Sequence, residues 1–134
     1  MKKQITILSL FLVVSATLFS CKKDTTSLKA RIIGKWTVNK IVVSGNTDES
    51  LNGTFNYTAN DYLDFKSNND DQVELSLTNQ RTIGSYIISL GNDFNMVFPE
   101  GVSYCTVSAL SGTQLQFTAK IDKTNIVKVY SLTR

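Results

Sequence analysis

Cysteine has the most reactive side chain in this sequence of 134 residues, which contains two of them, Cys21 and Cys105. Cys105 lies in a strand-like run, Val102–Val107. A thiol becomes a nucleophile when a neighbouring base or cation lowers its pKa, and histidine is the usual base. The chain contains no histidine. We therefore expect Cys105 to be a buried, unreactive thiol rather than a catalytic one.

The densest group of carboxylates is Asp70, Asp71 and Glu74. Such a group could bind calcium or supply a general acid and a general base. Its spacing departs from the Asp-x-Asp-x-Asp-Gly pattern of calcium loops, and Asp is also common in hairpin turns. We interpret the group as a turn between strands. The sequence also lacks a Gly-x-Ser-x-Gly element and a phosphate-binding glycine loop, so it predicts no enzyme, no metal site and no cofactor.

The beginning of the chain has the layout of a secretory signal peptide. A positive segment, Met1–Gln4, precedes an apolar run of 15 residues, Ile5–Phe19, and the small residue Ser20 follows. A helix that spans a bilayer needs about 20 apolar residues, so a transmembrane helix is the weaker alternative. A second alternative is an ordinary signal peptide cut near Ser15-Ala16-Thr17.

Leu18-Phe19-Ser20-Cys21, at the end of this run, resembles the lipobox of bacterial lipoproteins. The resemblance implies that residues 1–20 are removed as a signal peptide and that Cys21 becomes the lipidated first residue. Such a cysteine carries a diacylglycerol thioether and usually an acyl group, such as palmitate, on its amine. Two or more acyl chains give stable membrane attachment without a spanning segment. A lipidated Cys21 would leave Cys105 without a disulfide partner.

Residues 21–30 then form the lipidated cysteine and a polar tether. In the enteric sorting rule an aspartate after the cysteine retains a lipoprotein at the inner membrane, whereas this chain has Lys22 there. We therefore expect an outer-membrane protein that faces the periplasm or the cell surface. Two of the 14 basic residues lie in the leader, which leaves 12 basic residues against 11 acidic ones. This balance disfavours a nucleic-acid binder.

The rest of the chain, residues 31–134, reads as one domain of short strands. A helical turn or two is expected over Ser27–Ile33, with Ser27 as N-cap and Gly34 as the stop. Polar turns, several of which contain glycine, separate the strand-like segments that follow. These segments are Trp36–Val43, Phe55–Thr58, Tyr62–Lys66, Val73–Thr78, Arg81–Leu90, Phe94–Phe98, Val102–Leu110, Leu115–Ile121 and Ile126–Thr133.

No link between these strands is long enough for a crossover helix, so neighbouring strands should be antiparallel. The pattern predicts an all-β domain: an up-and-down antiparallel barrel of about eight strands after a short helical turn. A β-sandwich is the alternative. On the segment Leu115–Ile121, alternation places Leu115, Phe117, Ala119 and Ile121 inside.

Gly34-Lys35-Trp36, at the start of the first strand, resembles the Gly-x-Trp motif of lipocalins. The terminal Arg134 on the last strand fits the same family, whose members pack an arginine across the motif tryptophan. The likeness extends over about residues 33–134. The resemblance implies a lipocalin-like barrel closed at one end by Gly34, Trp36 and Arg134.

The strands carry large side chains that could either line a ligand cavity or fill a core. They are Tyr62, Phe65, Tyr86, Phe94, Met96, Phe98, Tyr104, Phe117 and Tyr130. The candidate ligand-lining or core residues that we single out are Trp36, Tyr86, Phe94, Met96, Phe98, Tyr104 and Phe117. The first functional hypothesis is a membrane-anchored lipocalin-like lipoprotein that binds a small apolar ligand. The alternative is a filled barrel that serves as a protein-interaction or structural module.

Overall fold

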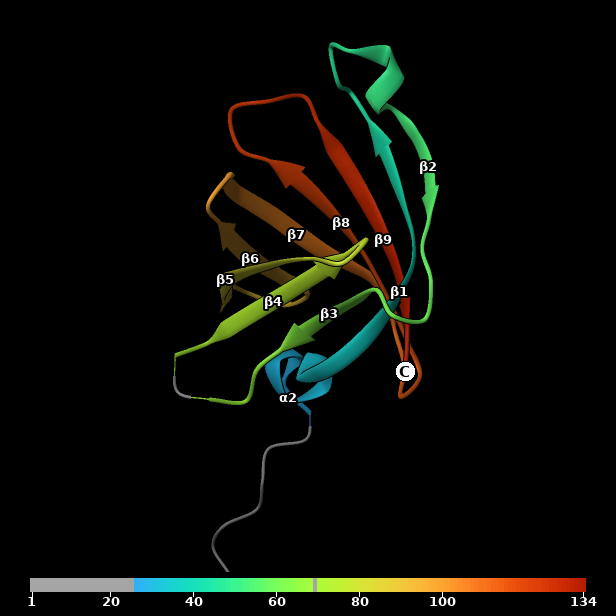
Figure 1. Ribbon diagram of the computed structural model, residues 1–134. Helices are drawn as coiled ribbons and strands as arrows, with labels where there is room; N and C mark the ends of the chain where they lie inside the picture. The colour runs from blue at the N-terminus through green and yellow to red at the C-terminus, as the bar shows by residue number, and fades with distance from the viewer. Residues whose placement is uncertain (1–25, 69) are drawn as a thin grey trace, which may run out of the picture.

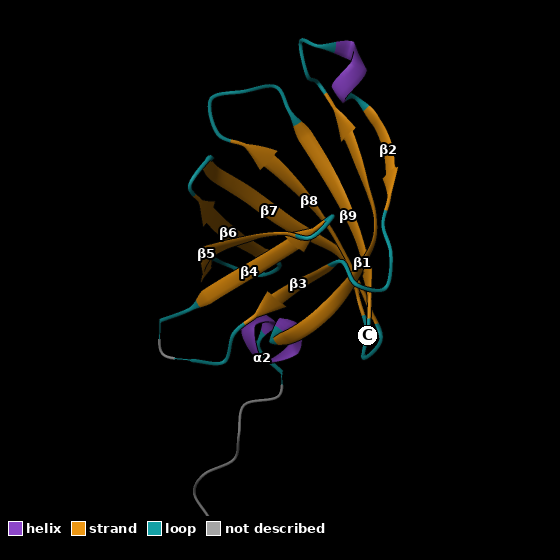
Figure 2. Ribbon diagram, in the orientation of Figure 1, coloured by secondary structure: helices purple, strands orange, loops and turns teal. Residues whose placement is uncertain are grey.

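A computed structural model describes residues 26–68 and 70–134. Their fold is an all-β, closed barrel of eight antiparallel strands with one extra strand and one short α-helix, as the sequence predicted (Figures 1 and 2). The elements are α2 (Leu28–Ile32), β1 (Gly34–Ser44), the 3-10 helix η2 (Glu49–Leu51), β2 (Gly53–Asn56), β3 (Tyr62–Phe65), β4 (Gln72–Leu77), β5 (Gln80–Ile88), β6 (Asp93–Phe98), β7 (Gly101–Leu110), β8 (Gln114–Ile121) and β9 (Val127–Thr133).

Strand β1 organises the barrel, because it is long enough to pair with three partners. One edge pairs with β9, from Thr37↔Thr133 to Ser44↔Val127, and this pairing closes the ring. The other edge is divided: Gly34–Thr37 pairs with β3, and Lys40–Val43 pairs with β2. The predicted segment Phe55–Thr58 therefore contributes an extra strand beside the ring, and β3 to β9 with β1 make the eight.

Local sequence explains the turns and the faces of the strands. The β4–β5 hairpin has the two-residue loop Thr78-Asn79, and both residues have positive φ, as a type I′ turn requires. On β8 the expected alternation is confirmed, because Leu115, Phe117 and Ala119 are buried while Gln116 and Lys120 are exposed.

Aromatic rings fill the half of the barrel nearer α2. Phe65 meets Tyr86 and Phe94 edge to face, with ring centroids 5.1 and 5.7 Å apart. Phe94 meets Phe117 at 5.1 Å, and Phe117 stacks on Tyr130 at 4.7 Å with an interplanar angle of 11°. Each of these five residues is at most 5% exposed, so this half of the interior is a packed core.

Helix α2 closes the barrel at the end where β1 begins and β9 ends (Figure 1). The Ser27 side chain caps its first turn by accepting from the Ala30 N–H, as predicted. Leu28 and Ile32 are buried against the core. Trp36 is fully buried and donates its indole N–H to the Ile32 carbonyl at 2.7 Å.

Arg134 completes the closed end. Its guanidinium lies 3.8 Å from the centre of the Trp36 ring. The same group donates to the carbonyls of Gly112, Ile33 and Arg31 at 3.0, 2.8 and 3.1 Å. The structure thus brings together the three residues that the sequence proposed for barrel closure, Gly34, Trp36 and Arg134, since Nη1 also lies 3.5 Å from the place where a Gly34 Cβ would be.

Candidate functional site

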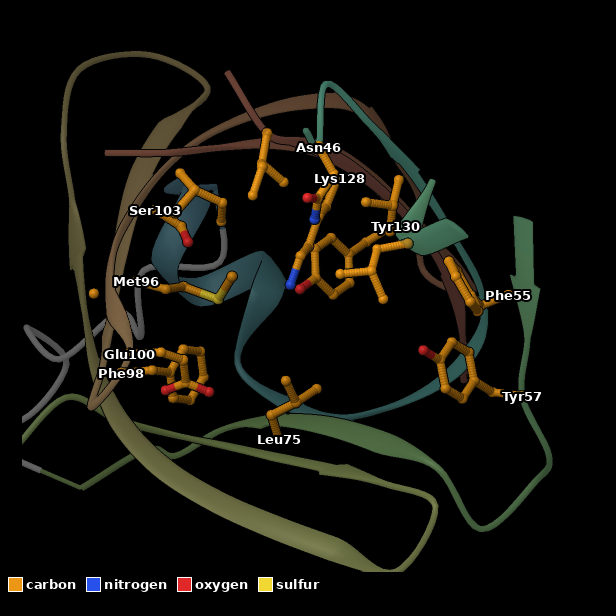
Figure 3. A pocket seen from close by; sticks show the side chains of 15 residues that line it. Asn46, Phe55, Tyr57, Leu75, Met96, Phe98, Glu100, Ser103, Lys128 and Tyr130 are labelled. Carbon is orange, nitrogen blue, oxygen red and sulfur yellow. The ribbon is translucent and has the colours of Figure 1, made fainter. Parts of the chain in front are cut away.

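The opposite end of the barrel holds a cavity of about 360 Å³ (Figure 3). This volume falls within the range of roughly 300–1,000 Å³ that small-molecule sites occupy. More than half of its lining residues are apolar: Val43, Leu51, Phe55, Leu75, Met96, Phe98, Ile121 and Ile126. The others are Asn46, Tyr57, Glu100, Gly101, Ser103, Lys128 and Tyr130.

Most of these side chains point into the cavity because they occupy the inward positions of strands whose side chains alternate between the two faces. Successive inward positions on β6 place Met96 and Phe98 on one wall. On β9, Lys128 and Tyr130 share the inner face, because residues two apart on a strand point the same way. Leu75 of β4 reaches in from the remaining side (Figure 3).

The rim comes from the β1–β2 loop and from β2, which overlaps the predicted strand Phe55–Thr58. This loop is ordered by reciprocal bonds between Asn46 and Asn52: the Asn46 N–H donates to the Asn52 side chain, which donates back to the Asn46 carbonyl. Two apolar rim residues remain partly in water, Leu51 at 52% exposure and Phe55 at 39%. An apolar rim above an apolar cavity favours entry of an apolar molecule.

Tyr130 forms the base of the cavity, above the aromatic core. Its ring stacks on Phe117, and burial raises the pKa of its phenol. Burial also raises the pKa of Tyr57, which points inward from the far side (Figure 3). Both phenols therefore stay protonated at neutral pH and can donate hydrogen bonds to a bound molecule.

Phe98 keeps its position because Gly84 lies beneath it. A Cβ on Gly84 would come within 2.7 Å of the Phe98 ring and within 2.2 Å of the Val97 carbonyl oxygen. Only glycine leaves this space on β5, so the residue shapes the cavity wall although it does not line the cavity.

Six of the seven residues singled out from the sequence as ligand-lining or core lie inside the barrel. Met96 and Phe98 line the cavity. Trp36, Tyr86, Phe94 and Phe117 are buried in the core and lie outside the lining.

The prediction for Tyr104 is wrong: its side chain is 49% exposed on the outside of β7. The inward positions of that strand belong to Ser103, Cys105 and Val107, and a strand cannot bury two successive side chains on one face. Tyr62, also grouped with the interior aromatics, faces outward and lies under the Lys35 ammonium at 3.7 Å.

The cysteine and the carboxylates that the sequence offered as candidates for catalysis or metal binding have structural partners or are buried. Cys105 is buried, and this burial raises the pKa of its thiol to about 12. Glu74 lies on the outer wall and accepts from Arg81 and Tyr62, with Lys66 at 3.4 Å. Asp71 pairs with Lys29. Among residues 26–68 and 70–134, His, Cys, Asp and Glu side chains form no cluster of three or more that could hold a metal ion.

The lipidation site predicted at Cys21, with the leader and the first part of the tether, lies outside the described residues. Within the described ranges, no helix has the length and apolar character needed to cross a bilayer. Comparison of the chain with protein-family models, with curated proteins and with solved structures finds no match in any of the three.

Proposed function

We propose that this protein is a membrane-anchored, lipocalin-like lipoprotein that binds a small apolar ligand in the cavity at the open end of its barrel. The cavity carries the proposal. It is large enough for a small molecule, mostly apolar, open at one end and backed by a packed core. The pairing of Trp36 with Arg134 at the closed end supports the lipocalin-like assignment, because the sequence resemblance anticipated that contact.

The anchor is proposed from the lipobox-like segment that ends at Cys21. Its test is metabolic labelling with palmitate. The wild-type protein should incorporate label and sediment with membranes. Cys21→Ser should do neither, because the serine hydroxyl lacks the sulfur on which the diacylglyceryl thioether forms. Equal labelling of Cys21→Ser would contradict the assignment.

The geometry of the barrel gives the anchored protein an orientation. Thr26, which precedes α2 at the closed end, lies five residues after Cys21, and five residue steps can span at most about 18 Å. Strand β1 alone has 11 residues, or about 36 Å of length. The open end therefore points away from the membrane that holds the anchor, and the ligand enters from the aqueous side.

Displacement of an apolar fluorophore tests the binding site. The chain from residue 21 with Cys21→Ser keeps every residue of the described core, which lies entirely between Leu28 and Leu132. Leu75→Trp should fill the cavity and abolish saturable binding. Ile87→Trp is the matched control, because Ile87 is 59% exposed outside the barrel. If fluorophore binding is lost equally in both variants, or is retained in both, the result would favour the alternative of a filled interaction module.

A further inference from the structure

Lys128 is a cation on the inner face of a barrel wall. Its register partners are Val43 on β1 and Ala119 on β8, so apolar residues flank it on both sides. It shares this face with Tyr130 and Leu132, which are 5% and 2% exposed. Figure 3 shows the Lys128 side chain reaching into the cavity.

No ion pair neutralises this ammonium within residues 26–68 and 70–134. The four carboxylate contacts of lysine and arginine there belong to Lys29, Lys66 and Arg81. Glu100 also lines the cavity, but it is exposed on the turn between β6 and β7. Water therefore solvates Glu100 readily, whereas Lys128 is half-buried and faces the cavity, so much of its hydration comes from water inside the cavity.

The difference in hydration between Lys128 and Glu100 determines which class of ligand the cavity favours. An apolar molecule that expels water from the cavity also removes the hydration of the Lys128 ammonium, which is costly unless another charge replaces it. An anionic group on the ligand would supply that charge. The Tyr130 phenol, two residues along the same face, is neutral and can donate a hydrogen bond to the same group.

We propose that the cavity binds amphiphiles with an anionic head, which contacts Lys128 and Tyr130. The apolar chain lies against Leu75, Met96 and Phe98, which come from strands on the other side of the barrel. This inference rests on the proposed ligand-binding function and names the ligand class.

Calorimetric titration with three ligands of equal chain length tests the inference: decanoate, decanol and decyltrimethylammonium. The protein is the chain from residue 21 with Cys21→Ser. Decanoate should bind at least about tenfold more tightly than decanol, because a charged hydrogen bond is worth that much or more. The cationic ligand should bind most weakly.

Lys128→Met retains most of the apolar stem and removes the charge. It should reduce decanoate affinity by about tenfold or more and leave decanol affinity equal or higher. Lys120→Met is the matched control, since Lys120 is exposed on the outside of β8 opposite Tyr104, and it should change neither affinity. Circular dichroism establishes that each variant is folded.

The outcomes separate the two proposals. Equal binding of decanoate and decanol to the wild type would overturn the inference and leave the ligand-binding cavity intact; this comparison needs no variant. Preference for the cationic ligand, lost in Glu100→Gln, would also overturn it by placing the head at the rim. Failure of all three ligands to bind would overturn the proposed function itself.

Discussion

Replacing Arg134 tests how the closed end of the barrel is held together. Its guanidinium covers the Trp36 ring at 3.8 Å and donates to three carbonyls, two of which belong to Arg31 and Ile33 at the end of α2. Trp36 itself binds the carbonyl of Ile32. The arginine therefore joins β9, α2 and the β7–β8 turn.

The expected magnitude follows from these contacts. A partly exposed cation–π contact is worth about 1 kcal/mol. Three exposed hydrogen bonds contribute about 0.5–1 kcal/mol each, at the low end of the usual range because water can replace the donor. Arg134→Ala should therefore lower the free energy of unfolding by about 2.5–4 kcal/mol. Arg134→Lys should recover less than half of this, because an ammonium cannot stack flat on the indole and reach three carbonyls.

Urea unfolding of the chain from residue 21 with Cys21→Ser, followed by fluorescence and by circular dichroism, measures the loss. Trp36 is the only tryptophan, so its emission reports directly on the closed end. Arg31→Ala is the matched control: its side chain donates to one carbonyl, that of Leu110, and the loss should be below about 1 kcal/mol. Equal effects of Arg134→Ala and Arg31→Ala, with an unchanged emission maximum, would refute the reasoning.

Three further predictions concern the outer wall, the core and the cavity wall. The Arg81 and Tyr62 hydrogen bonds lower the pKa of Glu74 to about 2, so the stability that they provide is present above about pH 4.5 and is lost as the pH falls toward 2. This loss is at most about 3 kcal/mol, and Glu74→Gln should flatten the acid side of a stability–pH curve; an unchanged curve would contradict the contact. Phe117→Ala should lower the free energy of unfolding by about 3–5 kcal/mol in urea, and a loss below 1 kcal/mol would remove Phe117 from the core. Gly84→Ala should cost about 1–3 kcal/mol and weaken fluorophore binding by displacing Phe98, whereas Gly112→Ala, with open space around it, should do neither.

The sequence predicted the barrel because its strongest signals are local. On β8, Leu115, Phe117 and Ala119 alternate with polar residues, so only one register buries the apolar face. Ser27 marks the start of α2 because its side chain accepts from the Ala30 N–H, and Gly34 marks the end because it adopts a positive φ.

The same reasoning failed on β7, where both faces carry apolar residues. Val102 and Tyr104 compete with Cys105 and Val107 for the interior, and pairing with β6 and β8 decides in favour of the second set. Tyr104 is large and aromatic, but its position on the strand sends it outward.

The sequence suggested Met96 and Phe98 as ligand-lining residues, but the rim of the cavity could not be predicted, because it depends on how distant elements meet. β1 divides one edge between β2 and β3, so that the rim residues Leu51 and Phe55 stand above the interior. One signal was available: in Val127–Leu132 the alternation that buries Tyr130 and Leu132 also turns Lys128 inward. A lysine on the buried face of a strand is unusual enough to mark a site.

The central claim is that a small apolar molecule enters the cavity, and Met96 offers the most direct measurement. In the chain from residue 21 it is the single methionine, so a carbon-13 label on its methyl group gives one NMR signal from the cavity wall. Titration with decanoate should shift this signal saturably, and Leu75→Trp should abolish the shift while Ile87→Trp preserves it. A signal that stays in place throughout the titration, or moves equally in both variants, would contradict the account.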